Sequence, residues 1–239
     1  MVYLLITTFL AFYLKGITGF GNTLVMNAMF SFVKENRFTT PVDLLVGLPA
    51  NLMISWKHRK ELVPSVVLPL GVATLLGNIP GILILSRVNG EVLKIILGFV
   101  LIIMSLLMMF GMKNTFRRHQ PTKIEIYSVG LFSGILVGMF GIGAFSAIYL
   151  SKLSKRREEF RSNLCFVFLL DNFFRLFAYT YQGLITQEVL RLSLCMIPVS
   201  YLGLRASRKT DQRLSELHIR YIVLILLSIS GLLLVLKNL

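Results

Sequence analysis

The sequence predicts an all-α, polytopic helical membrane protein, and three observations lead to this fold class. Several long runs contain no Asp, Glu, Lys or Arg, among them residues 62–86 and 126–151. A helix needs roughly 20 apolar residues to cross a bilayer core, so both runs are long enough. Charged residues make up 15% of the chain, whereas soluble domains carry about 25%. The basic residues gather between apolar runs, as in loops that face the cytoplasm and anionic headgroups.

Read as helices, the apolar runs predict eight segments, at about 4–33, 41–56, 64–86, 92–112, 126–151, 162–182, 190–206 and 219–236. Pro41 and Pro64 lie near predicted helix starts, where proline is favoured, and Asn89-Gly90 predicts a tight turn before the fourth segment. The first segment is too long for one crossing and carries Lys15 near its middle. We expect the Lys15 amine to reach the membrane interface; the alternative is that Lys15 binds an anion at mid-membrane.

The chain also looks internally duplicated. The segment Gly16-Ile-Thr-Gly19-Phe-Gly21 recurs 122 positions later as Gly138-Met-Phe-Gly141-Ile-Gly143, and Gly81 recurs at Gly203 with the same offset. We therefore predict two homologous four-segment repeats, each with a glycine-broken first helix. The predicted boundaries are 1–112 for the first transmembrane repeat, 113–125 for a connecting basic loop and 126–239 for the second transmembrane repeat.

The distribution of Lys and Arg does not give one orientation in the membrane. Counted over alternate loops it favours an N-terminus outside the cell, yet the first half alone favours the opposite. Either the bias is weak in this chain, or one glycine-broken segment re-enters the membrane instead of crossing it.

The glycine breaks are the first candidate for a binding site. An interrupted helix leaves backbone N–H groups free at the start of its second half, and these groups, with the helix dipole, favour an oxyanion. Gly19, Gly21, Gly141 and Gly143 are therefore candidate substrate-binding positions, and Asn22 is a candidate donor beside the first break. The alternative is that the glycines are ordinary helix-packing positions and that Asn22 bonds to a neighbouring helix.

Polar and ionisable residues inside the apolar segments are the second candidate, because such residues are costly in lipid. Asp171 and Arg175 are four positions apart and share a helix face with Asn172. We predict that Arg175 and Asn172 bind substrate and that Asp171 couples or gates transport; the alternative is a structural Asp171–Arg175 ion pair. Asn51 follows Pro49 in mid-segment, where a lost backbone hydrogen bond opens a polar point, so it joins the substrate-binding candidates.

Two further polar residues have structural interpretations. Asp43 lies near the start of the second segment, so we expect an interfacial or helix-capping carboxylate. Asn78, before Pro80 and Gly81, resembles Asn51 in its setting, and both asparagines have a plain helix-to-helix hydrogen bond as the alternative.

Several function classes are not favoured. The net charge of +14 is also found in nucleic-acid-binding proteins, but here the basic clusters at 57–60, 113–118, 152–161 and 205–213 alternate with apolar segments. The histidines and the two cysteines lack metal-ligand spacing. The sequence contains no Ser-His-Asp set and no Walker loop, so we expect no enzyme activity, no catalytic residues, no metal, no cofactor and no ATP-driven step.

The two glycine motifs, with Ile148-Tyr149-Leu150 after the second, resemble those of the TauE/SafE family of sulfite exporters and related anion permeases. The resemblance covers nearly the whole chain, because the family also has two four-helix halves. It implies movement of small sulfur-containing anions such as sulfite and sulfonates. The chain departs from the family pattern, which has glycine or proline at these places, at Asn22, Thr23, Ala28 and Ala144.

The sequence as a whole therefore predicts a secondary permease for a small anion, a sulfur oxyanion or organosulfonate such as sulfite. The expected partners are that anion, the lipid bilayer of a bacterial plasma membrane and a second copy in a homodimer, with no nucleic acid. The alternative is a non-transporting membrane scaffold or assembly factor.

Overall fold

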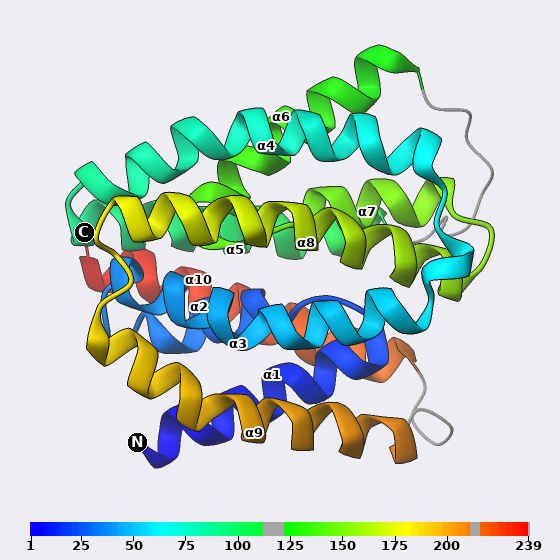
Figure 1. Cartoon of the computed structure of the whole chain (residues 1–239). Coiled ribbons are helices and arrows are strands. Elements are labelled where there is room, and N and C mark those ends of the chain that lie inside the picture. Colours follow the sequence, from blue (N-terminus) through cyan, green and yellow to red (C-terminus); the bar gives the residue numbers. More distant parts are fainter. Residues whose placement is uncertain (112–121, 211–215, 239) are drawn as a thin grey trace. The chain divides into compact units, whose positions relative to one another are not determined.

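Helices form all the regular structure in the computed structural model, which describes residues 1–111, 122–210 and 216–238 (Figure 1). Their order is α1 (Val2–Thr18), α2 (Asn22–Phe30), α3 (Asn36–Lys57), η1 (Arg59–Glu61, a 3-10 turn), α4 (Pro64–Arg87), α5 (Gly90–Gly111), α6 (Lys123–Phe140), α7 (Ala144–Leu153), α8 (Arg157–Tyr181), α9 (Gln187–Thr210) and α10 (Glu216–Asn238). The predicted all-α class is therefore confirmed.

Six of the described helices are long and apolar enough to cross a membrane: α3, α4, α5 over Gly90–Leu107, α6, α8 and α9 over Gln187–Ser207. Helix α1 and the Leu224–Asn238 part of α10 are apolar but shorter. The helix ends lie within a few residues of the predicted ones, except that α3 and α8 each begin about five residues early, at Asn36 and Arg157, so that Pro41 lies in the second turn of α3. The chain is therefore a multi-pass membrane protein.

The chain forms two compact units. Unit 1 comprises Met1–Gly47, Val88–Met109 and Ile185–Leu239, and unit 2 comprises Leu48–Arg87 and Phe110–Leu184. Each unit thus combines residues from both halves of the sequence. The predicted repeat boundaries therefore do not coincide with the boundaries of the compact units, and the repeats stay a prediction.

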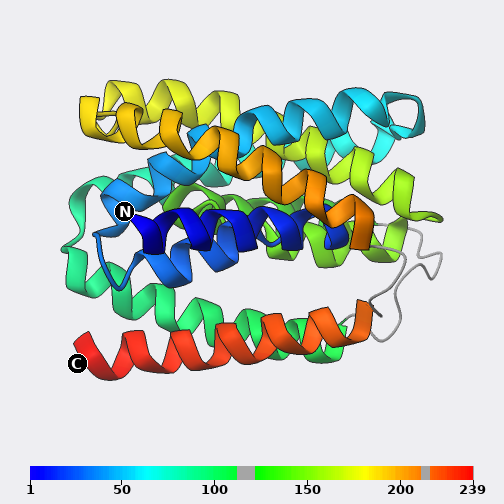
Figure 2. The ribbon, with the colours of Figure 1, turned by 90° about the horizontal axis from the view of Figure 1, so that it is seen from below.

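Small residues bring the helices of unit 1 into close contact. Helix α9 packs along α1 (Figure 2), where a Cβ atom on Gly203 would lie only 2.5 Å from the Phe9 carbonyl oxygen. Helices α5 and α10 also lie side by side (Figure 2), because Gly98 and Gly231 each face the other's carbonyl oxygen. Such glycine contacts are typical of helix pairs in membranes, where lipid tails give no hydrophobic drive to associate.

Unit 2 is built on the same principle around α4 and α6. Ala73, Gly77 and Gly81 on α4 face Gly130, Gly134 and Gly138 on α6. These residues repeat every four positions on both helices, which is the small-residue spacing that lets two backbones touch. Helix α8 packs on α4. Helix α7, which lies between α6 and α8 in the sequence, contacts both of them.

Both glycine-broken segments fold back instead of continuing. In unit 1, the Tyr3 hydroxyl donates to the Met29 carbonyl oxygen at 3.0 Å, joining the start of α1 to the end of α2. In unit 2, the Ser146 hydroxyl donates to Ser133 at 2.8 Å. Residues 13 apart in a continuous helix would be separated by about 20 Å. Each break is therefore the tip of a helical hairpin. The sequence left open whether the broken segments continue or turn back, and both turn back.

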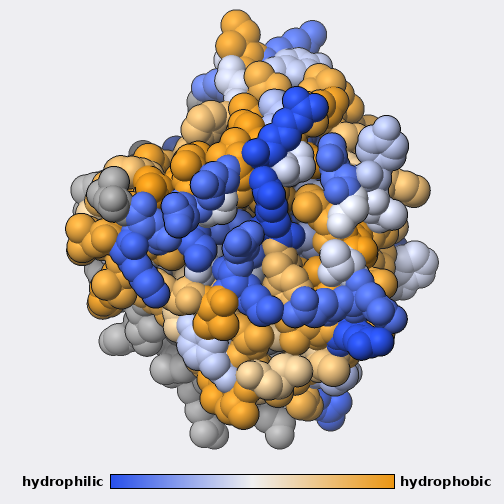
Figure 3. Space-filling model, turned by 90° about the vertical axis from the view of Figure 1, so that its left-hand side faces the viewer, coloured by the Kyte–Doolittle hydropathy of each residue, from blue (hydrophilic) through white to orange (hydrophobic). Residues whose placement is uncertain are grey.

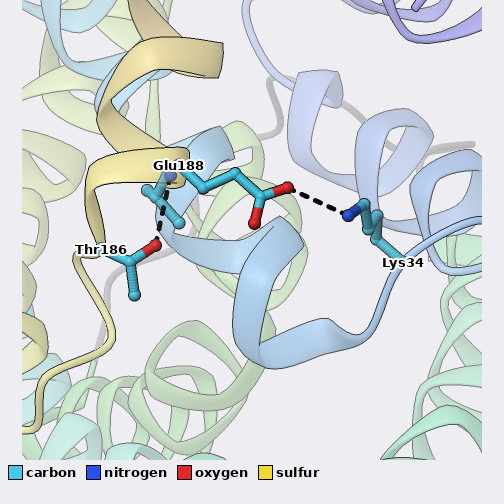
Figure 4. Close-up of polar contacts among 4 residues, drawn as sticks. Lys34, Thr186 and Glu188 are labelled. Carbon is cyan, nitrogen blue, oxygen red and sulfur yellow. Dashed lines mark hydrogen bonds and ion pairs between the residues drawn. The ribbon is translucent and has the colours of Figure 1, made fainter.

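At one end of unit 1, residues in or beside the connections between helices form polar contacts with one another. Lys34, after α2, forms an ion pair of 3.1 Å with Glu188 in the first turn of α9 (Figure 4), and Arg37 donates to the Val88 carbonyl oxygen at 2.8 Å. The face seen from the left of Figure 1, where α3, α5 and α9 begin, carries clustered hydrophilic residues beside hydrophobic ones (Figure 3). The contacts of Lys34 and Arg37 therefore join the chain connections at this end of unit 1.

Candidate functional site

The break in unit 1 requires glycine for conformational reasons. Helix α1 ends at Thr18 and α2 begins at Asn22, with Gly19 at φ 86° and Gly21 at φ 93° between them. Side chains other than glycine rarely adopt such positive φ angles. A Cβ atom on Gly21 would meet nothing closer than the Thr18 hydroxyl, at 4.0 Å. The predicted interruption is therefore present, and its glycine requirement comes from the backbone rather than from crowding.

A buried charged network lies beside this break. The Lys15 ammonium donates to the Asn22 side-chain oxygen at 3.0 Å, and the Asn22 amide nitrogen donates to Asp43 on α3 at 3.1 Å. All three side chains are buried, with Lys15 only 1% exposed. The expectation that Lys15 reaches the interface was wrong, because α2 folds back and encloses the amine. Asp43 is likewise not an interfacial or capping carboxylate.

The break in unit 2 is built from two different glycines. Gly141 ends α6 in the left-handed conformation at φ 71°, and its N–H donates to the carbonyl oxygen of Val137. Gly143, in contrast, has φ −93°, and a Cβ atom there would overlap the ring of Phe168. The first glycine of each motif lies where two helices pack together: Gly16 of α1 faces Ser207 of α9, and Gly138 of α6 faces the Asn78 carbonyl oxygen of α4.

Asp171 on α8 is fully enclosed and is held by α4. The Asn78 amide nitrogen donates to Asp171 Oδ1 at 2.9 Å, and the nearby Thr74 hydroxyl donates to the Gly71 carbonyl oxygen at 2.8 Å. Two oxygens of this group, Asp171 Oδ2 and Asn78 Oδ1, are buried without a partner. Asn78, which the sequence left outside the site, is therefore the residue that binds the predicted coupling carboxylate.

Arg175 forms no ion pair with Asp171, although the structure describes both side chains and they lie one turn apart on α8. The Arg175 guanidinium lies over the Tyr179 ring, 5.3 Å from its centroid, and the Tyr179 hydroxyl donates to the Gly138 carbonyl oxygen at 2.8 Å. Arg175 is 2% exposed, and its Nε and Nη2 have no hydrogen-bond partner. Arg175 and Asp171 therefore form no direct ion pair, although the charge of Arg175 still acts on Asp171.

The remaining candidates are buried as expected, but no ligand contact defines their role. Asn51 on α3 and Asn172 on α8 are 4% and 7% exposed. Among the candidates, unit 1 holds Gly19, Gly21 and Asn22, and the others belong to unit 2. In the part of the chain that the structure describes, no group of three His, Cys, Asp or Glu residues can hold a metal ion.

The fold and these two polar centres define a class of protein: a multi-pass helical membrane protein with two glycine-broken helical hairpins and buried charged groups beside them. The family model of the sulfite exporter TauE/SafE family matches residues 4–234. The chain therefore belongs to the TauE/SafE family, a family of membrane transporters. No curated protein and no solved structure matched the chain.

Proposed function

We propose that the chain is a secondary permease that moves a small sulfur oxyanion or organosulfonate, such as sulfite, across a bacterial plasma membrane. One observation carries the proposal: Arg175 is a buried cation whose Nε and Nη2 lack hydrogen-bond partners. Burying a charged group without hydrogen-bond partners is costly. Such a group is typical of a binding site for a ligand of opposite charge.

The chemistry of the guanidinium favours an oxyanion over other anions. Its N–H groups form a planar fork that binds two oxygens of a carboxylate, phosphate or sulfur oxyanion at once. Tyr179 supports this fork from one side through its ring and is itself fixed by the Gly138 carbonyl. The guanidinium plane is thus oriented by a residue that is anchored to α6.

The helix breaks support the proposal from a second direction. The start of α2 and the start of α7 each follow a glycine break, and broken helices in transporters present such N-terminal ends to anionic groups. Irregular backbone at membrane depth is tolerated where protein or a water-filled cavity surrounds it. We propose that Gly19, Gly21 and Asn22 in unit 1, and Gly141 in unit 2, contribute to substrate binding in this way, with Gly143 giving α7 room against Phe168.

We further propose that the two sequence halves are homologous repeats. In each predicted repeat, the helix before the glycine break packs on the third segment of the other repeat: α1 on α9 in unit 1, and α6 on α4 in unit 2. Gly203 approaches the backbone of α1 as Gly81 approaches the backbone of α6. These matching contacts support the offset of 122 positions seen in the sequence, because Gly81 and Gly203 differ by that offset.

The proposal is tested by flux into proteoliposomes that contain the purified protein. We expect uptake of at least one labelled anion among sulfite, thiosulfate and methanesulfonate, with competition by the unlabelled form. Protein-free liposomes and liposomes with heat-denatured protein serve as controls. A folded protein that takes up none of the three would contradict the proposal and would leave the scaffold alternative.

A further inference from the structure

The Asp171–Asn78 pair contains two buried oxygens without a hydrogen-bond partner, because the neighbouring Thr74 hydroxyl donates to the Gly71 carbonyl oxygen. Asn78 Nδ2 donates to Asp171 Oδ1 at 2.9 Å, so the two side chains meet edge to edge. Asp171 Oδ2 and Asn78 Oδ1 remain, and both are acceptors without a partner. Asp171 and Asn78 are 1% and 0% exposed, so bulk water does not supply the missing donors. Unpaired buried acceptors call for an explanation in a native structure.

A proton that binds to Asp171 would give both unpaired oxygens a hydrogen-bond partner at once. A carboxylic acid and a primary amide can pair at two points: the amide N–H donates to one carboxyl oxygen, and the acid O–H donates to the amide oxygen. The first of these bonds is present in the structure. The two atoms that would form the second are Asp171 Oδ2 and Asn78 Oδ1. Protonation converts the carboxylate plus H⁺ into the neutral acid, with no other bond broken.

The surrounding charges favour a proton over a metal cation. Arg175, one turn along α8, is the charged neighbour that acts on Asp171, and its positive charge would repel a bound metal cation. The ionisable groups of the elements packed against α8 lie mainly at helix ends: Arg87 on α4, Lys152 on α7, and Arg59, Lys60 and Glu61 on η1, with Tyr149 within α7. Protonation removes the buried negative charge of Asp171, and an anion on Arg175 would compensate the positive charge that remains.

We propose that Asp171 is the proton-binding group of the transporter, and that a proton binds to Asp171 when an anion binds to Arg175. This inference rests on the proposed function. The unliganded pair Arg175⁺ and Asp171⁻ is neutral. An anion on Arg175 cancels the positive charge that stabilises the carboxylate, so Asp171 takes up one proton and the liganded state is neutral as well. Anion and proton then move in the same direction.

The experiment uses proteoliposomes loaded with a fluorescent pH indicator, with the membrane potential clamped by valinomycin and potassium. Methanesulfonate and thiosulfate are the probes, because both stay deprotonated near neutral pH and carry no proton themselves. With about one pH unit of gradient, acid outside, one coupled proton allows roughly tenfold accumulation of a monovalent anion. Methanesulfonate entry driven by its own gradient should acidify the lumen of wild-type vesicles.

Asp171→Asn mimics the protonated side chain in shape and neutrality. We expect this variant to keep the exchange of labelled for unlabelled anion at equal pH, but to lose accumulation driven by the pH gradient and to lose luminal acidification. Glu188→Gln is the matched control, since it removes an exposed carboxylate and should behave as wild type. Asp171→Asn that still accumulates anion tenfold would overturn the inference, as would wild-type accumulation driven by a sodium gradient alone.

A readout on the wild-type protein keeps the inference testable if Asp171→Asn does not fold. On addition of methanesulfonate at constant pH, an infrared difference spectrum should lose carboxylate absorption and gain carboxylic acid absorption. No such change, together with anion flux that moves no protons, would overturn the proton site while leaving the permease intact. Absence of exchange in the wild type would instead overturn the proposed function.

Discussion

The Tyr3 hydroxyl, at the start of α1, donates a hydrogen bond to the carbonyl oxygen of Met29, near the end of α2 and 26 residues later in the chain. The bond places both ends of the first apolar segment at the same end of unit 1. The Ser133–Ser146 bond shows the same reversal in α6 and α7. Both broken segments therefore reverse direction within their own unit, and we expect neither to change the side of the membrane on which the chain continues.

This reversal predicts one orientation in the membrane. If both hairpins return and every other helix crosses once, the chain order predicts that the connections after α3, α5, α7 and α9 share one side. The basic clusters at 57–60, 113–118, 152–161 and 205–213 lie at or beside these connections in the sequence. Basic loops face the cytoplasm, so we expect that side to be cytoplasmic. In cells expressing a variant with Cys165→Ala and Cys195→Ala, an impermeant maleimide should label Asn89→Cys and not Lys60→Cys. The reverse pattern would contradict the orientation.

Arg175→Ala should abolish anion flux while leaving the protein folded, because the substitution removes the cation that binds the anion. Arg175→Lys should retain only part of the flux, since an ammonium lacks the planar fork. If Arg175 merely neutralised Asp171, the double variant Arg175→Ala/Asp171→Asn would transport better than Arg175→Ala alone. Flux and size-exclusion profiles of the four proteins, wild type included, separate the two roles.

Gly77→Ala should weaken the contact between α4 and α6. Its Cβ atom would overlap the Leu131 carbonyl oxygen and lie 3.0 Å from Gly134 Cα, both parts of a backbone that cannot rotate away. We expect a loss of about 1–3 kcal/mol in the free energy of unfolding, as for other overpacked sites. Gly47→Ala is the control, because its Cβ atom meets only Asn22 Nδ2 at 3.6 Å, and it should be neutral or stabilising in denaturant titrations in mixed micelles.

Lys15→Met should destabilise unit 1, because it leaves Asn22 and Asp43 without the buried ammonium. The expected cost is about 1–3 kcal/mol, that of an unsatisfied buried polar group, and Lys15→Met/Asp43→Asn should recover part of it. Lys34→Met breaks an exposed ion pair, with side chains 44% and 66% exposed, and should cost less than about 1 kcal/mol. Equal effects of Lys15→Met and Lys34→Met on thermal unfolding would show that the buried network contributes nothing.

The sequence predicted the helices and their glycine breaks because both depend on local features. Gly19, Gly21 and Gly141 adopt the positive φ angles that glycine permits. The direction of the chain after each break was not predictable, since hydrophobic periodicity is the same for a helix that continues and for one that returns. Two apparently opposite charge biases were the visible sign of these reversals.

The polar centres were predicted only where their residues are close in sequence. Asp171 and Arg175 were found from their spacing on one helix, yet that spacing suggested an ion pair that does not form. The contact of Asn78 with Asp171 spans 93 positions, and that of Asn22 with Asp43 spans 21. Contacts of this kind depend on which helices pack together, which one sequence does not specify. The signal present was a polar residue, Asn78, in the middle of a charge-free run.

The most direct test is to locate a bound anion in a structure of the protein. Selenite or selenate replaces the sulfur oxyanion, and the anomalous scattering of selenium marks its position. We expect a selenium site in unit 2 with anion oxygens about 2.7–2.9 Å from Arg175 Nε or Nη2, and its loss in Arg175→Ala. Selenium bound only at the basic clusters between the apolar segments, with Arg175 still unliganded at saturating anion, would contradict the account.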